Sequence, residues 1–177
     1  ATIPKDLAEK TKEMHEKGIK RTHTSVGDWS SEVAKKRLLR THSTATSFRM
    51  LAKLAKDSIE TGKPIANKKY FYVANNFRNE AVDATHLAEF YQAEGFITGD
   101  DLGLADVMGF VKEVYAKLRI NKIRFKPTFN TYTEPSMEAH YYDEKMSKWY
   151  ALINSGIFRQ ETLKALGINK TIIAWGM

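Results

Sequence analysis

Two neighbouring segments hold the side chains best suited to chemistry. In KKYFYVANNFRNE (residues 68–80) and HLAEFYQAEGFI (residues 86–97), aromatic and polar residues alternate with the period of a β-strand. A short polar turn at residues 81–85 would join the two strands into a hairpin. Antiparallel pairing would then set Glu80 opposite His86 and Phe90 opposite Asn76. One face of this hairpin would present six polar or aromatic side chains: Arg78, Glu80, His86, Phe90, Gln92 and Glu94.

A polar sheet face with one exposed ring suits a flat anionic ligand. A guanidinium can fork onto a phosphate, and a ring can stack on a base. We expect the opposite face to be filled by Phe71, Val73, Phe77 and Tyr91. The alternative is that the polar face is the solvated side of a half-buried sheet, which explains any single residue equally well. The whole set favours a binding site, because solvated faces are usually rich in Lys and Thr.

Composition excludes several classes of protein. The chain has 177 residues, 28 Lys and Arg against 21 Asp and Glu, a net charge of +7 and no cysteine. A disulfide scaffold, a thiolate metal site and cysteine nucleophilic catalysis are therefore excluded. The positive charge is a weak indication of an anionic partner. No apolar run reaches membrane-spanning length and the N-terminal segment is charged, so we expect a soluble cytoplasmic protein without a membrane partner.

The remaining patterns place these residues in an α+β domain. Helical spacing and Gly or Pro breaks predict helices at residues 4–17, 44–60, 104–118 and 161–166. Period-two patterns predict four further strands at residues 122–129, 136–142, 148–153 and 171–175. Short connections between consecutive strands favour a mainly antiparallel sheet, with helices on one face only. We expect an N-terminal helix and loop over residues 1–28 and one main domain over residues 29–177.

The segment NFRNE followed by HLAEFYQAEG resembles motif 2 of the class II aminoacyl-tRNA synthetases. Further segments narrow the resemblance, in this order: LRTHSTATSFR, KIRFKPTFNTYTEPSMEAHYY, KWYALINSGIFR and TIIAWGM. Together they are similar to the catalytic domain of phenylalanyl-tRNA synthetase alpha subunits of the archaeal and eukaryotic cytosolic type. The resemblance covers residues 37–177. It implies ATP and Mg²⁺, a tRNA(Phe) substrate, and a beta subunit with which the intact enzyme forms a heterotetramer.

The resemblance also implies roles for individual residues in ATP binding. Arg78 would bind the α-phosphate and act in catalysis, and Glu80 would read the adenine amino group. Phe90 would stack on the adenine, and His86 occupies the position that reaches the outer phosphates.

Seven other positions match residues that bind the amino acid. His42, Gln92 and Glu94 would approach its ammonium and carboxylate groups. Asn130, Tyr132 and Phe158 would line its side-chain pocket, and Arg124 would lie near the substrate. Each has an ordinary alternative by itself. His42 could be a helix-capping residue, Phe158 a core residue, and Asn130 a turn residue.

The sequence departs from the family in two respects: the residues at positions 151 and 153, and the lack of motifs 1 and 3. Ala151 stands where the family usually has a glutamate associated with magnesium, and alanine cannot bind a cation. Ile153 replaces a usual glycine and is expected to crowd the same region. Glu138, one strand earlier, could take part in metal binding instead. Motifs 1 and 3, including the arginine of motif 3, do not appear, so we expect a fragment that is weak or inactive in adenylate synthesis alone.

Two other functions compete with that of a synthetase fragment. A catalytically inactive synthetase paralogue or ligand-binding regulatory module would explain Ala151. The unbroken THST, FRNE and YTEP segments favour the enzyme. A plain RNA-binding domain is disfavoured, because the basic residues are spread along the chain without a known RNA-binding signature.

Overall fold

The computed structural model describes residues 5–17, 27–83 and 86–177, apart from the side chains of Leu7 and Met14. The chain divides into two compact units, Ala1–Leu39 and Arg40–Met177. Pro4 of the predicted first helix, residues 18–26 of the predicted N-terminal loop and residues 84–85 of the predicted turn at 81–85 lie outside the described residues. The expected domain division after residue 28 stays a prediction.

The first unit contains two helices. Helix α1 spans Lys5–Lys17, as predicted, and carries few apolar side chains. The ion pairs Lys12–Glu16 (3.9 Å) and Lys17–Glu13 (3.4 Å) follow the i,i+4 spacing that supports an exposed helix. Helix α2, Ser31–Ala34, was not predicted, and its N-cap Ser30 accepts a hydrogen bond from the backbone N–H of Val33.

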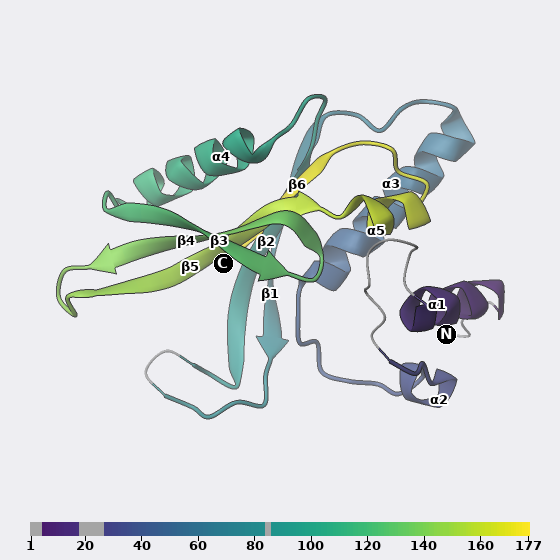
Figure 1. Cartoon of the computed structure of the whole chain (residues 1–177), viewed down its shortest axis with the longest axis horizontal. Helices are drawn as coiled ribbons and strands as arrows, with labels where there is room; N and C mark the ends of the chain where they lie inside the picture. Colours follow the sequence, from purple (N-terminus) through teal and green to yellow (C-terminus); the bar gives the residue numbers. More distant parts are fainter. Residues whose placement is uncertain (1–4, 18–26, 84–85) are drawn as a thin grey trace. The chain divides into compact units, whose positions relative to one another are not determined.

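The second unit is built on one antiparallel sheet of six strands (Figure 1). The strands are β1 Lys68–Phe77, β2 Glu89–Thr98, β3 Ile123–Asn130, β4 Thr133–Asp143, β5 Lys148–Phe158 and β6 Ile172–Gly176. They lie in the order β1-β2-β6-β5-β4-β3, so the last strand of the chain is inserted at the centre. The three helices of this unit are α3 Thr44–Thr61, α4 Leu104–Lys117 and α5 Gln160–Ala165. The predicted α+β class with an antiparallel sheet is confirmed.

The helices cover both faces of the sheet, so the expectation of one covered face was wrong. Leu51 and Ala55 of α3 and Leu163 of α5 pack with Phe96 and Ile172 in one buried cluster. On the other face, α4 supplies three buried side chains to a second cluster around Met137, Ala139, Ile153 and Ile173: Val107, Val111 and Tyr115. The central strands carry apolar side chains on both of their faces, as Ile172 and Ile173 of β6 show. Such strands need a helix on each face.

The β1–β2 hairpin has the expected register over its paired length. Asn76 lies opposite Phe90, and the paired strands end at Phe77 and Glu89. Glu80 and His86 lie beyond this paired region, in the connection between the strands, so they do not continue the ladder as expected.

The polarity of the hairpin is the reverse of the expectation. Phe71, Val73 and Tyr91 are 77%, 60% and 74% exposed, whereas Gln92 and Glu94 are 9% and 4% exposed. Alternation along a strand shows that its two faces differ, but it does not show which face is buried. Here α4 covers the central strands and leaves the apolar side of β1 open. The polar side instead faces a cavity under the start of α3.

A bulge in β5 separates Ala151 from Ile153. Ile153 pairs with Ala139, whereas Ala151 pairs with the next residue, His140. One extra residue on one strand moves the following side chain to the opposite face. Ile153 is therefore buried against α4 and lies in the second cluster, while Ala151 lines the cavity. The expected crowding of the site by Ile153 was wrong.

Candidate functional site

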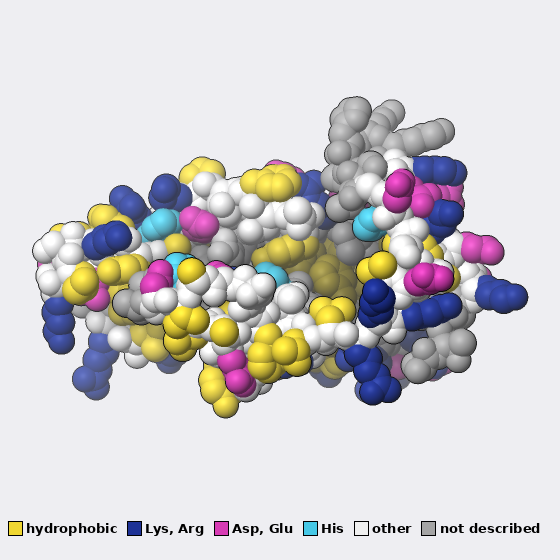
Figure 2. Space-filling model, turned by 90° about the horizontal axis from the view of Figure 1, so that it is seen from below, with side chains coloured by type: hydrophobic (Ala, Val, Ile, Leu, Met, Phe, Trp, Pro, Cys, Tyr) yellow, Lys and Arg dark blue, Asp and Glu magenta, His cyan; other side chains and the backbone are white. Residues whose placement is uncertain are grey.

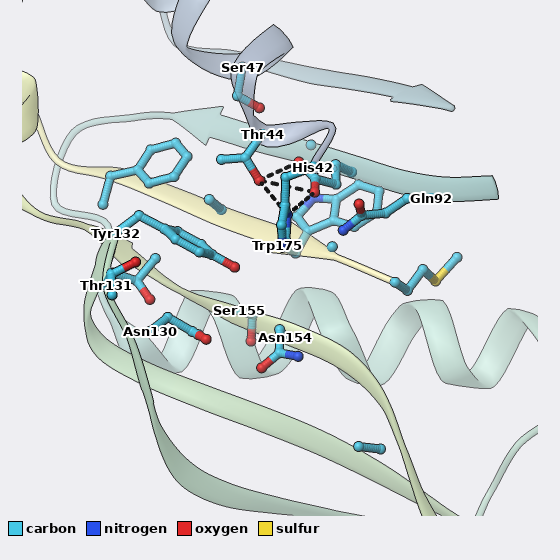
Figure 3. A pocket seen from close by; sticks show the side chains of 18 of the residues that line it. His42, Thr44, Ser47, Gln92, Asn130, Thr131, Tyr132, Asn154, Ser155 and Trp175 are labelled. Atoms are coloured by element: carbon cyan, nitrogen blue, oxygen red, sulfur yellow. Dashed lines mark hydrogen bonds and ion pairs between the residues drawn. The ribbon is translucent and has the colours of Figure 1, made fainter. Parts of the chain in front are cut away.

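A cavity of about 650 Å³ opens on the face of the sheet away from α4 (Figure 3). Its walls come from the start of α3, from Arg78 just after β1, from β2, β5 and β6, and from the turn between β3 and β4. Eight of the residues predicted for ATP or amino-acid binding line it: His42, Arg78, Phe90, Gln92, Glu94, Asn130, Tyr132 and Phe158. The fold therefore brings together residues that are more than one hundred positions apart in sequence.

Glu94 is the buried anionic group of this cavity. Its carboxylate accepts hydrogen bonds from the Thr44 hydroxyl (3.0 Å to each oxygen) and lies 2.8 Å from the Tyr72 hydroxyl. The Nδ1 atom of His42 lies 3.7 Å from the same carboxylate. These partners compensate the cost of burying a charge. The carboxylate is thus held in place as a receptor for a cationic group.

Tyr72 connects Glu94 to the start of α3. Its hydroxyl lies 2.7 Å from the backbone carbonyl of Ser43 and 2.9 Å from the Ser47 hydroxyl. Burial raises the pKa of Tyr72 well above its usual range, and the hydrogen bond to Glu94 raises this pKa further. The tyrosine therefore stays neutral and acts as a hydrogen-bonding brace.

A second polar network holds Gln92. The Asn76 amide donates to the Ser43 hydroxyl (2.8 Å) and to the Gln92 side-chain oxygen. Asn76 is fully buried, so these partners satisfy an amide that has no access to water. The side-chain nitrogen of Gln92 lies close to Gly176: a Cβ atom at that position would be 3.3 Å from this nitrogen. The network fixes the Gln92 amide beside Glu94 in the cavity wall.

The open side of the cavity carries a cation and a ring. The Arg78 guanidinium carbon lies 5.0 Å from the centre of the Phe90 ring, and Nη2 lies 3.3 Å from Nε2 of His42. A guanidinium held against a ring is oriented before any ligand arrives. The arrangement can bind a phosphate beside a flat aromatic group.

The far wall is aromatic, with polar edges. The Tyr132 ring meets the His42 ring edge to face, with centroids 6.3 Å apart, and Phe158 packs on Phe48 at 4.9 Å. Burial raises the pKa of Tyr132, and the Glu94 charge adds to this effect. The Asn130 backbone N–H donates to the Ser136 hydroxyl (3.2 Å), which fixes the turn that presents these groups. The buried amide nitrogen of the Asn130 side chain has no hydrogen-bond partner among the described residues.

Four predicted site residues do not line the cavity: Glu80, His86, Arg124 and Glu138. His86 Nδ1 lies 2.9 Å from Asp83. Arg124 lies over the ring of Trp149, at 4.3 Å. The Glu138 carboxylate pairs with His140 at 3.1 Å. Their proposed roles stay predictions.

Sequence reasoning missed several wall residues. Thr44, Ser47, Asn154, Ser155 and Trp175 line the cavity (Figure 3). Thr44 stands in the same short segment as His42, and helical spacing from it points to Ser47 on the same helix face. Trp175 comes from the central strand β6, whose position beside β2 no local pattern reveals.

The described residues do not by themselves make up a complete magnesium site. Alanine at position 151 offers the cavity no oxygen ligand at the place where the family resemblance implies a carboxylate. Within residues 5–17, 27–83 and 86–177, no three His, Cys, Asp or Glu side chains come together as a possible metal site.

The fold and this cavity are those of a class II synthetase core, and the sequence comparisons agree. A family model for the tRNA synthetase class II core domain (F) matches residues 6–177, so the chain belongs to this family. It is 48% identical over 167 residues to a probable phenylalanine–tRNA ligase alpha subunit of Enterocytozoon bieneusi, covering 93% of this chain and 34% of the relative. It is 46% identical to the phenylalanine–tRNA ligase alpha subunit of Danio rerio, covering 99% of this chain and 35% of the relative.

The human phenylalanine–tRNA ligase alpha subunit is 42% identical over 177 residues, covering 99% of this chain and 34% of the relative. The chain thus spans about one third of the length of these curated relatives. Within the described residues, no helix combines the length and apolar character needed to cross a bilayer.

Proposed function

We propose that this chain forms the adenylate-forming core of a phenylalanine–tRNA ligase alpha subunit. The core binds phenylalanine and ATP, forms phenylalanyl adenylate, and passes the amino acid to tRNA(Phe). The proposal includes a beta-subunit partner and a cytoplasmic location, as in the resemblance described above. The observation that carries it is the placement of a buried carboxylate, Glu94, between an aromatic wall and the pair formed by exposed Arg78 and half-buried Phe90.

The amino acid binds by charge at one end and by shape at the other. Glu94 receives the ammonium group, since a braced carboxylate in a water-poor wall attracts a cation strongly. The side-chain ring contacts Tyr132 and Phe158, whose edges and faces favour an aromatic group. Gln92 lies on the same face of β2 as Glu94, and its fixed amide N–H groups donate to the α-carboxylate and orient it.

The nucleotide occupies the open side. Its adenine stacks on Phe90, and Arg78 holds the α-phosphate. An oxygen of the phenylalanine carboxylate attacks the α-phosphorus and forms a new P–O bond, while the bond to the β-phosphate oxygen breaks and pyrophosphate leaves. Arg78 stabilises the negative charge that accumulates on the α-phosphoryl oxygens. The protein contributes positioning and charge, and it needs no general base because the nucleophile is already ionised.

Calorimetric titration of phenylalanine and tyrosine into the chain tests this proposal. Phenylalanine should bind more tightly than tyrosine, and E94Q should weaken phenylalanine binding roughly tenfold to a hundredfold through loss of a charged hydrogen-bond acceptor. ATP binding should be weakened by F90A by about 1–3 kcal/mol, the value of one base stacked on an aromatic ring. Exposed Glu113 on α4 supplies the control variant, E113Q. Equal binding of both amino acids, or no effect of E94Q, would contradict the proposal.

A further inference from the structure

Tyr72 and Asn76 of β1 stand behind the cavity wall without lining it. They lie on the same side of the strand, with Ala74 midway between them. Strand register places Tyr72 directly opposite Glu94. It places Asn76 diagonally from Gln92, which pairs with Ala74. Each of the two residues therefore has one polar group of the cavity wall within reach, Tyr72 a carboxylate and Asn76 an amide.

Both residues are anchored on Ser43, at the start of α3. The Tyr72 hydroxyl lies 2.7 Å from the Ser43 carbonyl oxygen, and the Asn76 amide donates to the Ser43 hydroxyl at 2.8 Å. Ser43 is fully buried and is the N-cap of α3, yet its side chain makes no capping hydrogen bond. A serine in this position commonly caps the helix. Here its hydroxyl bonds to Asn76 instead.

The two connections from Ser43 end on groups of opposite polarity. The Tyr72 hydroxyl lies 2.8 Å from Oε2 of Glu94. Thr44 contacts both oxygens of this carboxylate and would by itself let it turn. The other connection runs through Asn76, whose amide donates to the side-chain oxygen of Gln92 and leaves the N–H groups of Gln92 for a ligand. One connection thus fixes an acceptor for a cation, and the other fixes a donor for an anion.

The ordinary explanation of this network is that it only fastens α3 to the sheet. Apolar side chains would do so at lower cost, because buried polar groups must first lose their water. Such apolar contacts are present farther along α3, where Leu51 and Ala55 pack in the first buried cluster. The described hydrogen bonds between α3 and the sheet come from residues 43–47, beside the two polar groups of the wall.

A broad field of surface charge does not replace these groups. Figure 2 shows the face away from α4, with Lys and Arg side chains gathered at the end formed by β3, β4 and β5, away from the start of α3. The charged groups of a small ligand in the cavity are therefore recognised by individual side chains. The orientation of those side chains before binding then decides the affinity.

We infer that Tyr72 and Asn76 are positioning residues that make the cavity selective for an α-amino acid, which carries an ammonium and a carboxylate on one carbon. Tyr72 acts through Glu94 on the ammonium half, and Asn76 acts through Gln92 on the carboxylate half. The inference rests on the proposed function, from which it takes the roles of Glu94 and Gln92. Removing one positioning residue weakens recognition of one half only, because the ligand must then order the released side chain.

Calorimetric titration of three ligands into the 177-residue chain tests this division. L-phenylalanine carries both charged groups, phenethylamine lacks the carboxylate, and 3-phenylpropanoate lacks the ammonium. Y72F should weaken binding of phenylalanine and phenethylamine roughly threefold to tenfold, and should leave that of 3-phenylpropanoate within about twofold. N76L should weaken binding of phenylalanine and 3-phenylpropanoate by about the same factor, and should leave that of phenethylamine within about twofold.

Neighbouring residues of β1 supply the matched controls. Y70F changes a tyrosine on the same side of the strand, whose ring stacks on Phe96. N75L changes an asparagine on the opposite side, whose amide donates to Glu89 at 2.7 Å. Neither control should change the affinity for any of the three ligands by more than about twofold.

Circular dichroism shows whether each variant is folded. If N76L is not, S43A takes its place, because it removes the hydroxyl that anchors Asn76 and keeps the carbonyl that contacts Tyr72. S43A should show the same ligand pattern as N76L.

Three outcomes would overturn the inference. An equal loss for all three ligands indicates a purely structural role, which weakens every ligand alike. Unchanged affinities in both variants show that neither residue positions anything, and a reversed pattern contradicts the assignment of the two halves. These outcomes leave the proposed function standing as long as the original chain prefers phenylalanine to tyrosine. If the original chain binds neither amino acid, the proposed function fails and the inference fails with it.

Discussion

Ala151 is the cavity residue that bears most directly on how phosphate charge is handled. Its side chain faces the cavity and offers no ligand to a cation. The variant A151E should weaken binding of metal-free ATP roughly tenfold or more, because a second carboxylate repels the phosphates. Magnesium should restore ATP affinity in A151E, whereas it should change the affinity of the original chain by less than about threefold. Calorimetry with ATP, with and without magnesium, measures both ratios.

The isosteric variant A151Q controls for the added bulk. It should weaken ATP binding equally with and without magnesium, since a neutral amide adds volume but no charge. A strong magnesium dependence in the original chain would show that other groups hold the metal, and it would contradict this prediction.

Tyr115 makes stability depend on alkaline pH. It is fully buried and its hydroxyl donates to the Ala139 carbonyl at 2.8 Å. Burial raises the pKa of Tyr115 to about 12, above the value near 10 of an unfolded chain. The folded state thus retains the proton longer, so this stabilisation is present below pH 10 and is lost as pH rises toward 12. By pH 11 the loss should be about 1 kcal/mol.

Urea unfolding of Y115F between pH 8 and pH 11 tests this assignment. Near neutral pH the variant should be less stable by about 1 kcal/mol, because one buried hydrogen bond is removed. The difference from the original chain should shrink as pH rises above 10. Y91F is the control, since Tyr91 is 74% exposed. A constant difference across this pH range would rule out Tyr115 as the source.

At the scale of the element, β1 should tolerate substitution on its apolar side and not on its polar side. V73T should change the free energy of unfolding by less than about 0.5 kcal/mol, because Val73 is 60% exposed. N76A should cost about 1–3 kcal/mol, since it leaves the buried Ser43 hydroxyl and Gln92 oxygen without their donor. Chemical denaturation of the two variants compares the faces directly. A larger loss in V73T than in N76A would contradict the described polarity.

The same strand shows what the sequence could and could not predict. Alternation and helical spacing correctly predicted the strands, the main helices and the pairing of Asn76 with Phe90, because these depend on local period. Which face of β1 is buried depends on where α3 and α4 pack, and no local pattern contains that information. The predicted end of β5 at residue 153 was too early, because Asn154, Ser155 and Gly156 are poor strand formers that β4 and β6 hold in place from both sides.

The candidate site, too, could be predicted from the sequence only in part. Residues borne by β2, such as Gln92 and Glu94, could be grouped from strand period alone. Placing His42 and Tyr132 beside them required the family resemblance, because they are distant in sequence. Half-buried Tyr72 and buried Asn76 were missed as site residues, since their role is to satisfy other side chains across elements. Their importance becomes visible only once the polar face is known to point inward.

At the scale of the whole molecule, residues 40–177 should fold and bind without residues 1–39. Every buried apolar side chain of the described residues belongs to Arg40–Met177, and all residues lining the cavity lie within it. A chain beginning at Arg40 should therefore unfold cooperatively, with a Tm within about 3 °C of the full chain. Phenylalanine at about 100 times its Kd should stabilise both chains by about 2.7 kcal/mol. Scanning calorimetry with and without phenylalanine measures both effects.

A chain beginning at residue 50 is the informative comparison, because it also removes His42, Thr44 and Ser47 from the cavity wall. It lacks the Thr44 donor to Glu94 and the Ser43 acceptor of Asn76, so two buried polar groups lose partners. We expect it to lose the phenylalanine response and to unfold at a lower temperature. If the chain beginning at Arg40 behaves like this shorter chain, then residues 1–39 contribute to the stability of the core, and the two units do not fold independently.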